Sequence, residues 1–101
     1  NFCLYKKDFT LQEAAVLEHK ESGRVLEVYT DLPGIQLYCG GWLAKQSNPG
    51  KANGKVTYRR GAALETQFYP DTVHFADVFP SRFVKANEEF KTTTEFRFSV
   101  K

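Results

Sequence analysis

Cysteine, histidine and long apolar runs are all scarce in this sequence of 101 residues, and each scarcity excludes a class of protein. Two cysteines, Cys3 and Cys39, allow at most one disulfide, whereas a small secreted scaffold needs several. We therefore expect two free thiols and a reducing compartment, the cytoplasm. The only two histidines, His19 and His74, lie far apart in the sequence, so no zinc site is expected. No window approaches 18 uncharged apolar residues, which excludes a transmembrane span.

An excess of charge of one sign is also missing, because 14 Lys and Arg face 12 Asp and Glu. Nucleic-acid-binding proteins usually concentrate positive charge, which is scattered here, so we expect neither a nucleic-acid nor a membrane partner. Residues that can form a core, in contrast, are plentiful: 42% of the residues are hydrophobic and 15% are aromatic. This composition excludes a disordered chain. A chain of this length forms one small domain at most.

The dominant period in the sequence is two, which is typical of half-buried strands. Residues 95–101 alternate without a break between apolar and polar side chains. Glu21-Ser22-Gly23 supplies a turn that joins the first two predicted strands as an antiparallel hairpin. The strands are predicted over residues 10–18, 24–30, 35–39, 62–68 and 95–101. Residues 44–57 are polar and are predicted to form a surface loop. No helix of convincing length is found, so the fold class is all-β, most consistent with an antiparallel sandwich.

Two of these strands combine an apolar face with a face that carries hydrogen-bonding groups. Residues 35–39 place Gln36 and Tyr38 on one face, and residues 62–68 place Glu65 and Gln67 on one face. If both strands lie in one sheet, these four side chains form a polar surface suited to a ligand with many hydroxyls. Alternation by itself favours a plainer interpretation, a solvated sheet face without a ligand.

Several blocks of the sequence, in order, resemble the C-terminal part of the galactose mutarotase (aldose 1-epimerase) family. The blocks are Asn1-Phe2-Cys3-Leu4, Arg24-Val25-Leu26-Glu27-Val28-Tyr29-Thr30, Pro33-Gly34-Ile35-Gln36-Leu37-Tyr38, Leu64-Glu65-Thr66-Gln67 and Tyr69-Pro70-Asp71. The resemblance implies that residues 1–101 are the C-terminal fragment of a single, larger antiparallel β-sandwich domain. It implies an isomerase of carbohydrate metabolism that interconverts the α and β anomers of free hexoses such as galactose and glucose.

The resemblance also implies roles for individual residues. Glu65 matches the family's general base, and Gln36 matches a residue that contacts the sugar. The family's acid histidine, a second histidine and a sugar-binding aspartate correspond to positions upstream of Asn1, so the remainder of the mutarotase chain is an expected partner. His74, which follows the Pro-Asp of the last block, is interpreted as a surface residue rather than as a second acid–base group.

The chemistry that the resemblance implies needs one base and one acid. The base removes a proton from the C1 hydroxyl, the acid protonates the ring oxygen, and no cofactor is required. Glu65 must then project into a carbohydrate pocket that is partly shielded from water. We expect the 101 residues alone to be inactive, because they supply only the base. Two alternatives stay open: a catalytically silent carbohydrate-binding β-sandwich, and a freestanding small β-domain, which unpaired strand edges disfavour.

Overall fold

The computed structural model describes residues 1–4, 8–43, 50–51, 54 and 57–101. These residues form the strands β1 (Phe2–Cys3), β2 (Gln12–His19), β3 (Arg24–Thr30), β4 (Gly34–Tyr38), β5 (Ala63–Gln67) and β6 (Thr94–Val100). The described chain contains no α-helix, and no helix in it could cross a membrane. The all-β prediction is confirmed, whereas the surface loop predicted over residues 44–57 lies largely outside the described residues. The two-residue strand β1 was not predicted, because it is too short to show a period.

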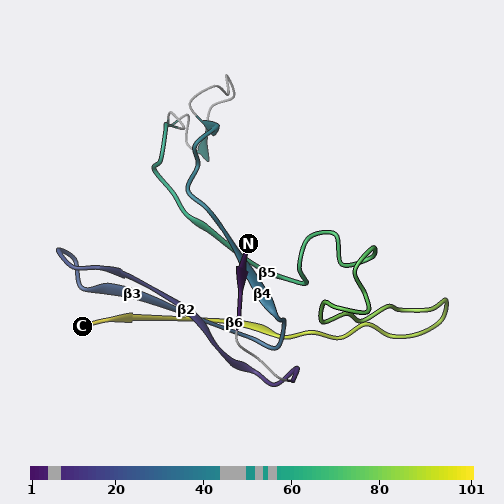
Figure 1. Cartoon of the computed structure of the whole chain (residues 1–101). Helices are drawn as coiled ribbons and strands as arrows, with labels where there is room; N and C mark the ends of the chain where they lie inside the picture. Colours follow the sequence, from purple (N-terminus) through teal and green to yellow (C-terminus); the bar gives the residue numbers. More distant parts are fainter. Residues whose placement is uncertain (5–7, 44–49, 52–53, 55–56) are drawn as a thin grey trace.

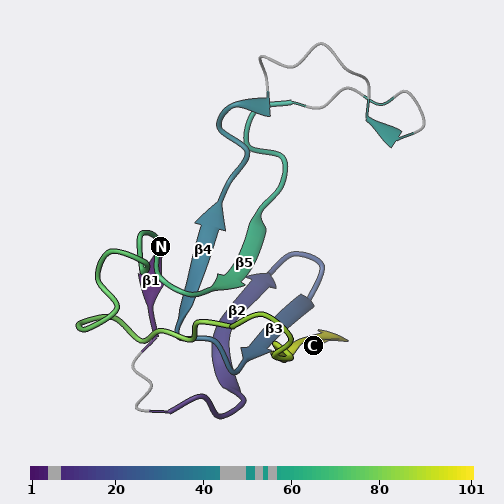
Figure 2. The ribbon, with the colours of Figure 1, turned by 90° about the vertical axis from the view of Figure 1, so that its right-hand side faces the viewer.

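The strands form two antiparallel sheets, ordered β1-β4-β5 and β2-β3-β6. Figure 2 shows β4 and β5 rising side by side above the β2–β3 hairpin. That hairpin was predicted, and its turn contains Gly23 at a φ of 67°, where a side chain would be strained. A bulge between Glu13 and Ala15 interrupts the pairing of β2 with β3 and explains why the alternation in β2 is weak.

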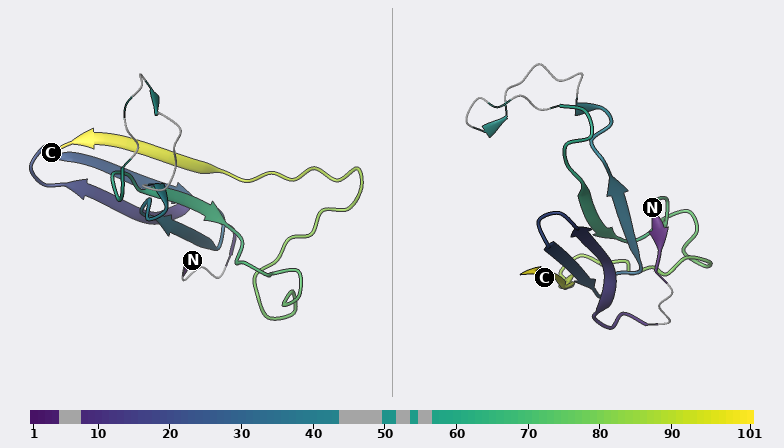
Figure 3. Two further views of the ribbon diagram at one scale, coloured as in Figure 1. Left: turned by 90° about the horizontal axis from the view of Figure 1, so that it is seen from above. Right: turned by 90° about the vertical axis from the view of Figure 1, so that its left-hand side faces the viewer.

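Strand β6 returns from far along the sequence to pair with β3. The pairing runs from Arg24 opposite Val100 to Thr30 opposite Thr94 without a shift in register. Seen from above, β2, β3 and β6 run alongside one another, and the connection between β5 and β6 extends beyond the sheets (Figure 3). The unbroken alternation of residues 95–101 therefore corresponds to a regular strand, as predicted, and this strand lies at the edge of its sheet.

The buried core is small and lies around β3 and the start of β4. Its apolar members are Val25, Val28, Leu32 and Ile35, of which Val28 is fully buried. Next to it, the two sheets are joined by threonine hydroxyls. Thr66 Oγ1 of β5 lies 2.6 Å from Thr94 Oγ1 of β6, and Thr94 Oγ1 lies 3.4 Å from the hydroxyl of buried Thr30. These contacts fix β5 against β6 and thereby place the sheet that carries Glu65.

Large apolar side chains remain exposed on both sheets. On β6, Phe98 is 78% exposed and Val100 is 73% exposed, while Phe2 on β1 is 60% exposed. Among the described residues, no strand pairs with the outer edges of β2, β6 and β5. Figure 1 shows β4 and β5 close to β6, and the described residues that follow β4 and precede β5 extend away from the other sheet. The described chain thus buries only part of the apolar surface that its sheets present.

Candidate functional site

The site begins with the pairing of β4 and β5, which brings the two predicted site residues together. Gln36 and Glu65 lie directly opposite each other in the antiparallel register. Side chains at such positions share a face and start about 4.5–5.5 Å apart at their Cβ atoms. Sequence analysis could place each residue on a face of its own strand, but only the register shows that they are neighbours. The two strands do lie in one sheet, which was the condition for a shared polar surface.

The same register completes a surface that we call the polar face, made of Gln36, Tyr38, Glu65 and Gln67. Tyr38 lies opposite Ala63, and Gln67 lies opposite Gly34, so all four side chains share one face of the sheet. The hydroxyl oxygen of Tyr38 accepts a hydrogen bond of 3.1 Å from the Trp42 amide. The other face carries Ile35, Leu37, Leu64 and Thr66 and turns toward the second sheet.

Glu65 is exposed and Gln36 is half-buried. Within the described part of the chain, neither side chain has a hydrogen-bonding partner. Glu65 is the charged member of an otherwise apolar groove of about 420 Å³, lined by Leu26, Ala62, Ala63, Leu64, Phe96 and Phe98. Because Leu64 and residues of β3 and β6 line it, this groove lies on the face turned toward the second sheet and Glu65 borders it, while the carboxylate on the polar face is open to water in the described chain. The shielding that a general base needs would have to come from other polypeptide.

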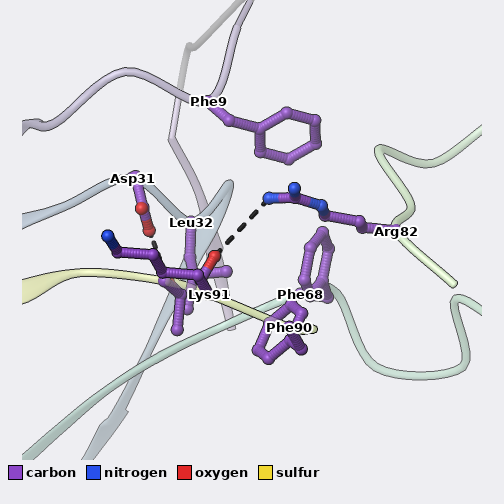
Figure 4. Close-up of a pocket in the computed structure, with 8 residues that line it drawn as sticks. Phe9, Asp31, Leu32, Phe68, Arg82, Phe90 and Lys91 are labelled. Carbon is purple, nitrogen blue, oxygen red and sulfur yellow. Dashed lines mark hydrogen bonds between the residues drawn. The ribbon is translucent and has the colours of Figure 1, made fainter. Parts of the chain in front are cut away.

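Two other hollows fit a hexose less well. One, of about 320 Å³, lies between the sheets and has the wholly apolar lining of a core space that more polypeptide would fill. The other holds about 30 Å³, which accommodates little more than a water molecule. Figure 4 shows this small hollow among Phe9, Phe68 and Phe90, with Arg82 donating a 3.5 Å hydrogen bond to the Lys91 carbonyl. By volume and by donor groups, the groove beside Glu65 and the adjacent polar face are the better candidate.

A second group of residues borders the polar face at Gly34. Gln67 Nε2 donates to Asn1 Oδ1 at 3.3 Å. A Cβ atom built on Gly34 would lie 3.1 Å from that same oxygen and 3.0 Å from the ring of Tyr69. Burial, followed by a hydrogen bond with the Cys3 side chain, raises the pKa of Tyr69. Sequence analysis missed this arrangement, because no periodicity links residues 1–3 with residues 67–69.

His74 lies apart from this arrangement in the connection after β5. Its Nδ1 contacts the carboxylate of Asp71, and its side chain is 74% exposed. The interpretation of His74 as a surface residue is therefore confirmed. Cys3 and Cys39 are both free, as predicted, and both are exposed.

These features define a class of protein: part of an antiparallel β-sandwich that presents a carboxylate and amides on one sheet face, an arrangement suited to a polyhydroxylated ligand. The chain belongs to the aldose 1-epimerase family, whose family model matches residues 1–97. It is 41% identical over 100 residues to galactose mutarotase of Mus musculus and 42% identical to that of Homo sapiens, in each case covering 99% of this chain. It is 32% identical over 74 residues, 72% of this chain, to aldose 1-epimerase of Escherichia coli (strain K12).

The match covers only part of these relatives. The chain spans 28% of the length of the two mammalian galactose mutarotases and 21% of the bacterial aldose 1-epimerase. Most of the length of these relatives therefore lies outside the match to these 101 residues.

Proposed function

We propose that this chain is the base-carrying portion of an aldose 1-epimerase that interconverts the α and β anomers of free hexoses such as galactose and glucose. Family membership supports the reaction class. The observation that carries the assignment of residues is the cross-strand pairing of Gln36 with Glu65 on an exposed face beside a groove of about 420 Å³.

In this mechanism, the Glu65 carboxylate takes the proton from the C1 hydroxyl while an acid from the remainder of the polypeptide protonates the ring oxygen. The bond between C1 and the ring oxygen breaks, which leaves an open-chain aldehyde. Rotation about C1–C2 and the reverse proton transfers close the ring as the other anomer. Gln36, one strand away from Glu65, hydrogen-bonds a sugar hydroxyl and holds C1 at the carboxylate. The proton count balances without any cofactor.

The remainder of the mutarotase polypeptide is the proposed partner of the exposed apolar surface. The side chains of Phe96, Phe98 and Val100 form an apolar stripe on an edge strand, and the groove beside Glu65 has a mostly apolar lining. Surfaces of this kind are uncommon on monomeric proteins unless something covers them. Covering them would also exclude water from Glu65, so completion of the fold and activation of the base would be linked.

The test is polarimetry of freshly dissolved α-D-glucose and α-D-galactose with the full-length polypeptide that carries these residues. Glu65→Gln is expected to lower turnover by at least about 10²-fold, because a positioned general base contributes about 10²–10⁴-fold. Glu27→Gln is the matched control, since Glu27 lies on the other sheet opposite Arg97, and its turnover should be unchanged. The isolated 101 residues should not accelerate either reaction.

Two results would contradict this function in different ways. Near-normal turnover by Glu65→Gln would reject the role of that carboxylate. Hexose binding without any acceleration by the unmodified full-length protein, measured by calorimetry, would instead support a catalytically silent carbohydrate-binding protein.

A further inference from the structure

A second cross-strand pair on the polar face lies two residues along β4 and β5 from the pair of Gln36 and Glu65. In this row Gly34 lies opposite Gln67. Glu65 and Gln67 are two residues apart on one strand, so they point the same way and their Cα atoms lie about 7 Å apart. The polar face therefore offers hydrogen-bonding groups at two places separated by roughly the length of a pyranose ring with its hydroxyls.

Gln67 is held in place by Asn1. Its Nε2 donates to Asn1 Oδ1 at 3.3 Å, and Gln67 is half-buried. An amide nitrogen committed to this bond fixes which way the other end of the amide points, because the two ends lie on one rigid plane. Among the described residues, nothing donates to Gln67 Oε1. That oxygen remains as an acceptor on the polar face.

Gly34 makes room for this arrangement. A side chain at this position would begin 3.1 Å from Asn1 Oδ1 and 3.0 Å from the Tyr69 ring. The absence of a side chain lets Asn1 lie over the strand and reach Gln67 while Tyr69 packs beside it. Asn1 and Tyr69 thus occupy the space above Gly34, and the amide of Gln67 that Asn1 orients lies next to the proposed catalytic pair.

We propose that Gln67, oriented by Asn1, binds the hydroxyl on C4 of the hexose while Glu65 acts at C1. This inference rests on the proposed function, because the proton transfer at C1 sets which end of the sugar lies at Glu65. In a pyranose, C4 lies across the ring from C1, so a sugar lying along β5 with C1 at Glu65 brings its C4 hydroxyl to the row of Gln67. Glucose and galactose differ only in the configuration at C4. Gln67 is therefore a specificity-determining residue and Asn1 its positioning residue.

The experiment compares Gln67→Met with the unmodified full-length protein on glucose, galactose, 4-deoxyglucose and 2-deoxyglucose. Methionine keeps the length of the side chain but accepts no comparable hydrogen bond. The unmodified protein should lose about 10-fold in kcat/KM when the 4-hydroxyl is removed, as expected for one lost hydrogen bond. Gln67→Met should show a similar loss on glucose and no further loss on 4-deoxyglucose. 2-Deoxyglucose keeps the 4-hydroxyl, so Gln67→Met should lose the same factor in kcat/KM on 2-deoxyglucose as on glucose. The ratio of the two kcat/KM values should therefore be the same in the variant and in the unmodified protein.

A uniform loss on all four sugars, 4-deoxyglucose included, would show a merely structural role and overturn the proposal. So would an unchanged dependence on the 4-hydroxyl in Gln67→Met. Failure of the proposed function is a separate result, because it appears as near-normal turnover in Glu65→Gln whatever Gln67→Met does.

Asn1 provides a second test that leaves Gln67 itself intact. Asn1→Leu removes the acceptor that orients Gln67 and should weaken the dependence on the 4-hydroxyl by a smaller factor than Gln67→Met. Asn1→Asp keeps an acceptor oxygen at the same place and should restore that dependence. Equal behaviour of the leucine and aspartate variants would show that Asn1 does not position Gln67.

Discussion

Each of the two sheets presents polar side chains on an outward face, but only on one sheet are most of these side chains bonded to one another. On the β2-β3-β6 sheet, the charged face consists of Glu13, Glu27, Tyr29, Glu95 and Arg97, which share one side of the sheet. Arg97 Nε donates to Glu95 Oε1 at 2.7 Å, and its guanidinium lies 3.9 Å from the centre of the Tyr29 ring. Tyr29 in turn donates to Glu13 at 3.4 Å.

The polar face of the β1-β4-β5 sheet is not paired in this way. In the described chain its Gln36 and Glu65 side chains have no partner, and Gln67 uses one amide hydrogen on Asn1. Groups that bond one another stabilise a surface, whereas unpaired donors and acceptors next to a groove are available to a ligand. The alternation of polar residues is the same in both sheets, so the pairing of side chains is what separates a structural face from a candidate site.

The largest expected effect on folding comes from adding a side chain at Gly34. Gly34→Ala should lower the free energy of unfolding of the full-length protein by about 1–3 kcal/mol, because the new methyl group crowds Asn1 and the Tyr69 ring. Gly61→Ala is the matched control: no atom lies within 4 Å of its added Cβ, and it should be neutral or stabilising by about 0.4–1 kcal/mol. Urea denaturation measures both. Equal effects of the two substitutions would show that close packing at Gly34 does not shape the polar face.

A smaller effect should follow from breaking the charged face at Glu95. The hydrogen bond from Arg97 holds the pKa of Glu95 below the ordinary value of 4.5. The ionised carboxylate therefore stabilises the folded protein above that ordinary pKa, and this contribution is lost as the pH falls through the lowered pKa. Glu95→Gln should remove this acid-dependent part of the stability, measured by urea denaturation between neutral and acidic pH.

Hexose turnover at neutral pH is the control for Glu95→Gln, and it should be unchanged. A loss of turnover comparable to that expected for Glu65→Gln would break the distinction between a structural and a functional face.

The sequence predicts individual strands well and their partners poorly. Residues 24–30 and 95–101 were both predicted as strands from alternation, but nothing local shows that β6 pairs with β3 across more than sixty residues of chain. Pairing of distant strands depends on how the whole core closes, which a period of two does not encode.

The candidate site could likewise be predicted only in part from the sequence. Glu65 and Gln36 were found from motifs that resemble a family, and their faces followed from alternation. Their position opposite each other, and the contacts of Asn1 with Gln67 and of Cys3 with Tyr69, depend on the register of strands far apart in the sequence. Glu65 is exposed in the described chain, and alternation within one strand does not predict what covers it.

The smallest effect concerns the surroundings of the polar face. Burial raises the pKa of Tyr69 first, and the hydrogen bond with Cys3 raises it further. Cys3→Ala should therefore lower the pKa of Tyr69 without bringing it fully to its ordinary value, because the contribution of burial remains. The measurement is phenolate absorbance during an alkaline titration, with Tyr69→Phe variants to isolate the signal of this tyrosine.

Cys39→Ala provides the matched control, because Cys39 is equally free and exposed but follows β4 instead of pairing with it. It should leave the titration of Tyr69 unchanged, and an equal shift in both variants would contradict the assigned contact. The raised pKa of Tyr69 also distinguishes the polar face from the charged face, where the pKa of Glu95 is lowered. A tyrosine is neutral at physiological pH even at its ordinary pKa, and the pKa of Tyr69 is raised further, so this phenol adds no negative charge beside Gly34. On the charged face Glu95 is paired with Arg97, whereas on the polar face neutral groups surround a single carboxylate, an arrangement that suits the proposed role of Glu65 as a general base.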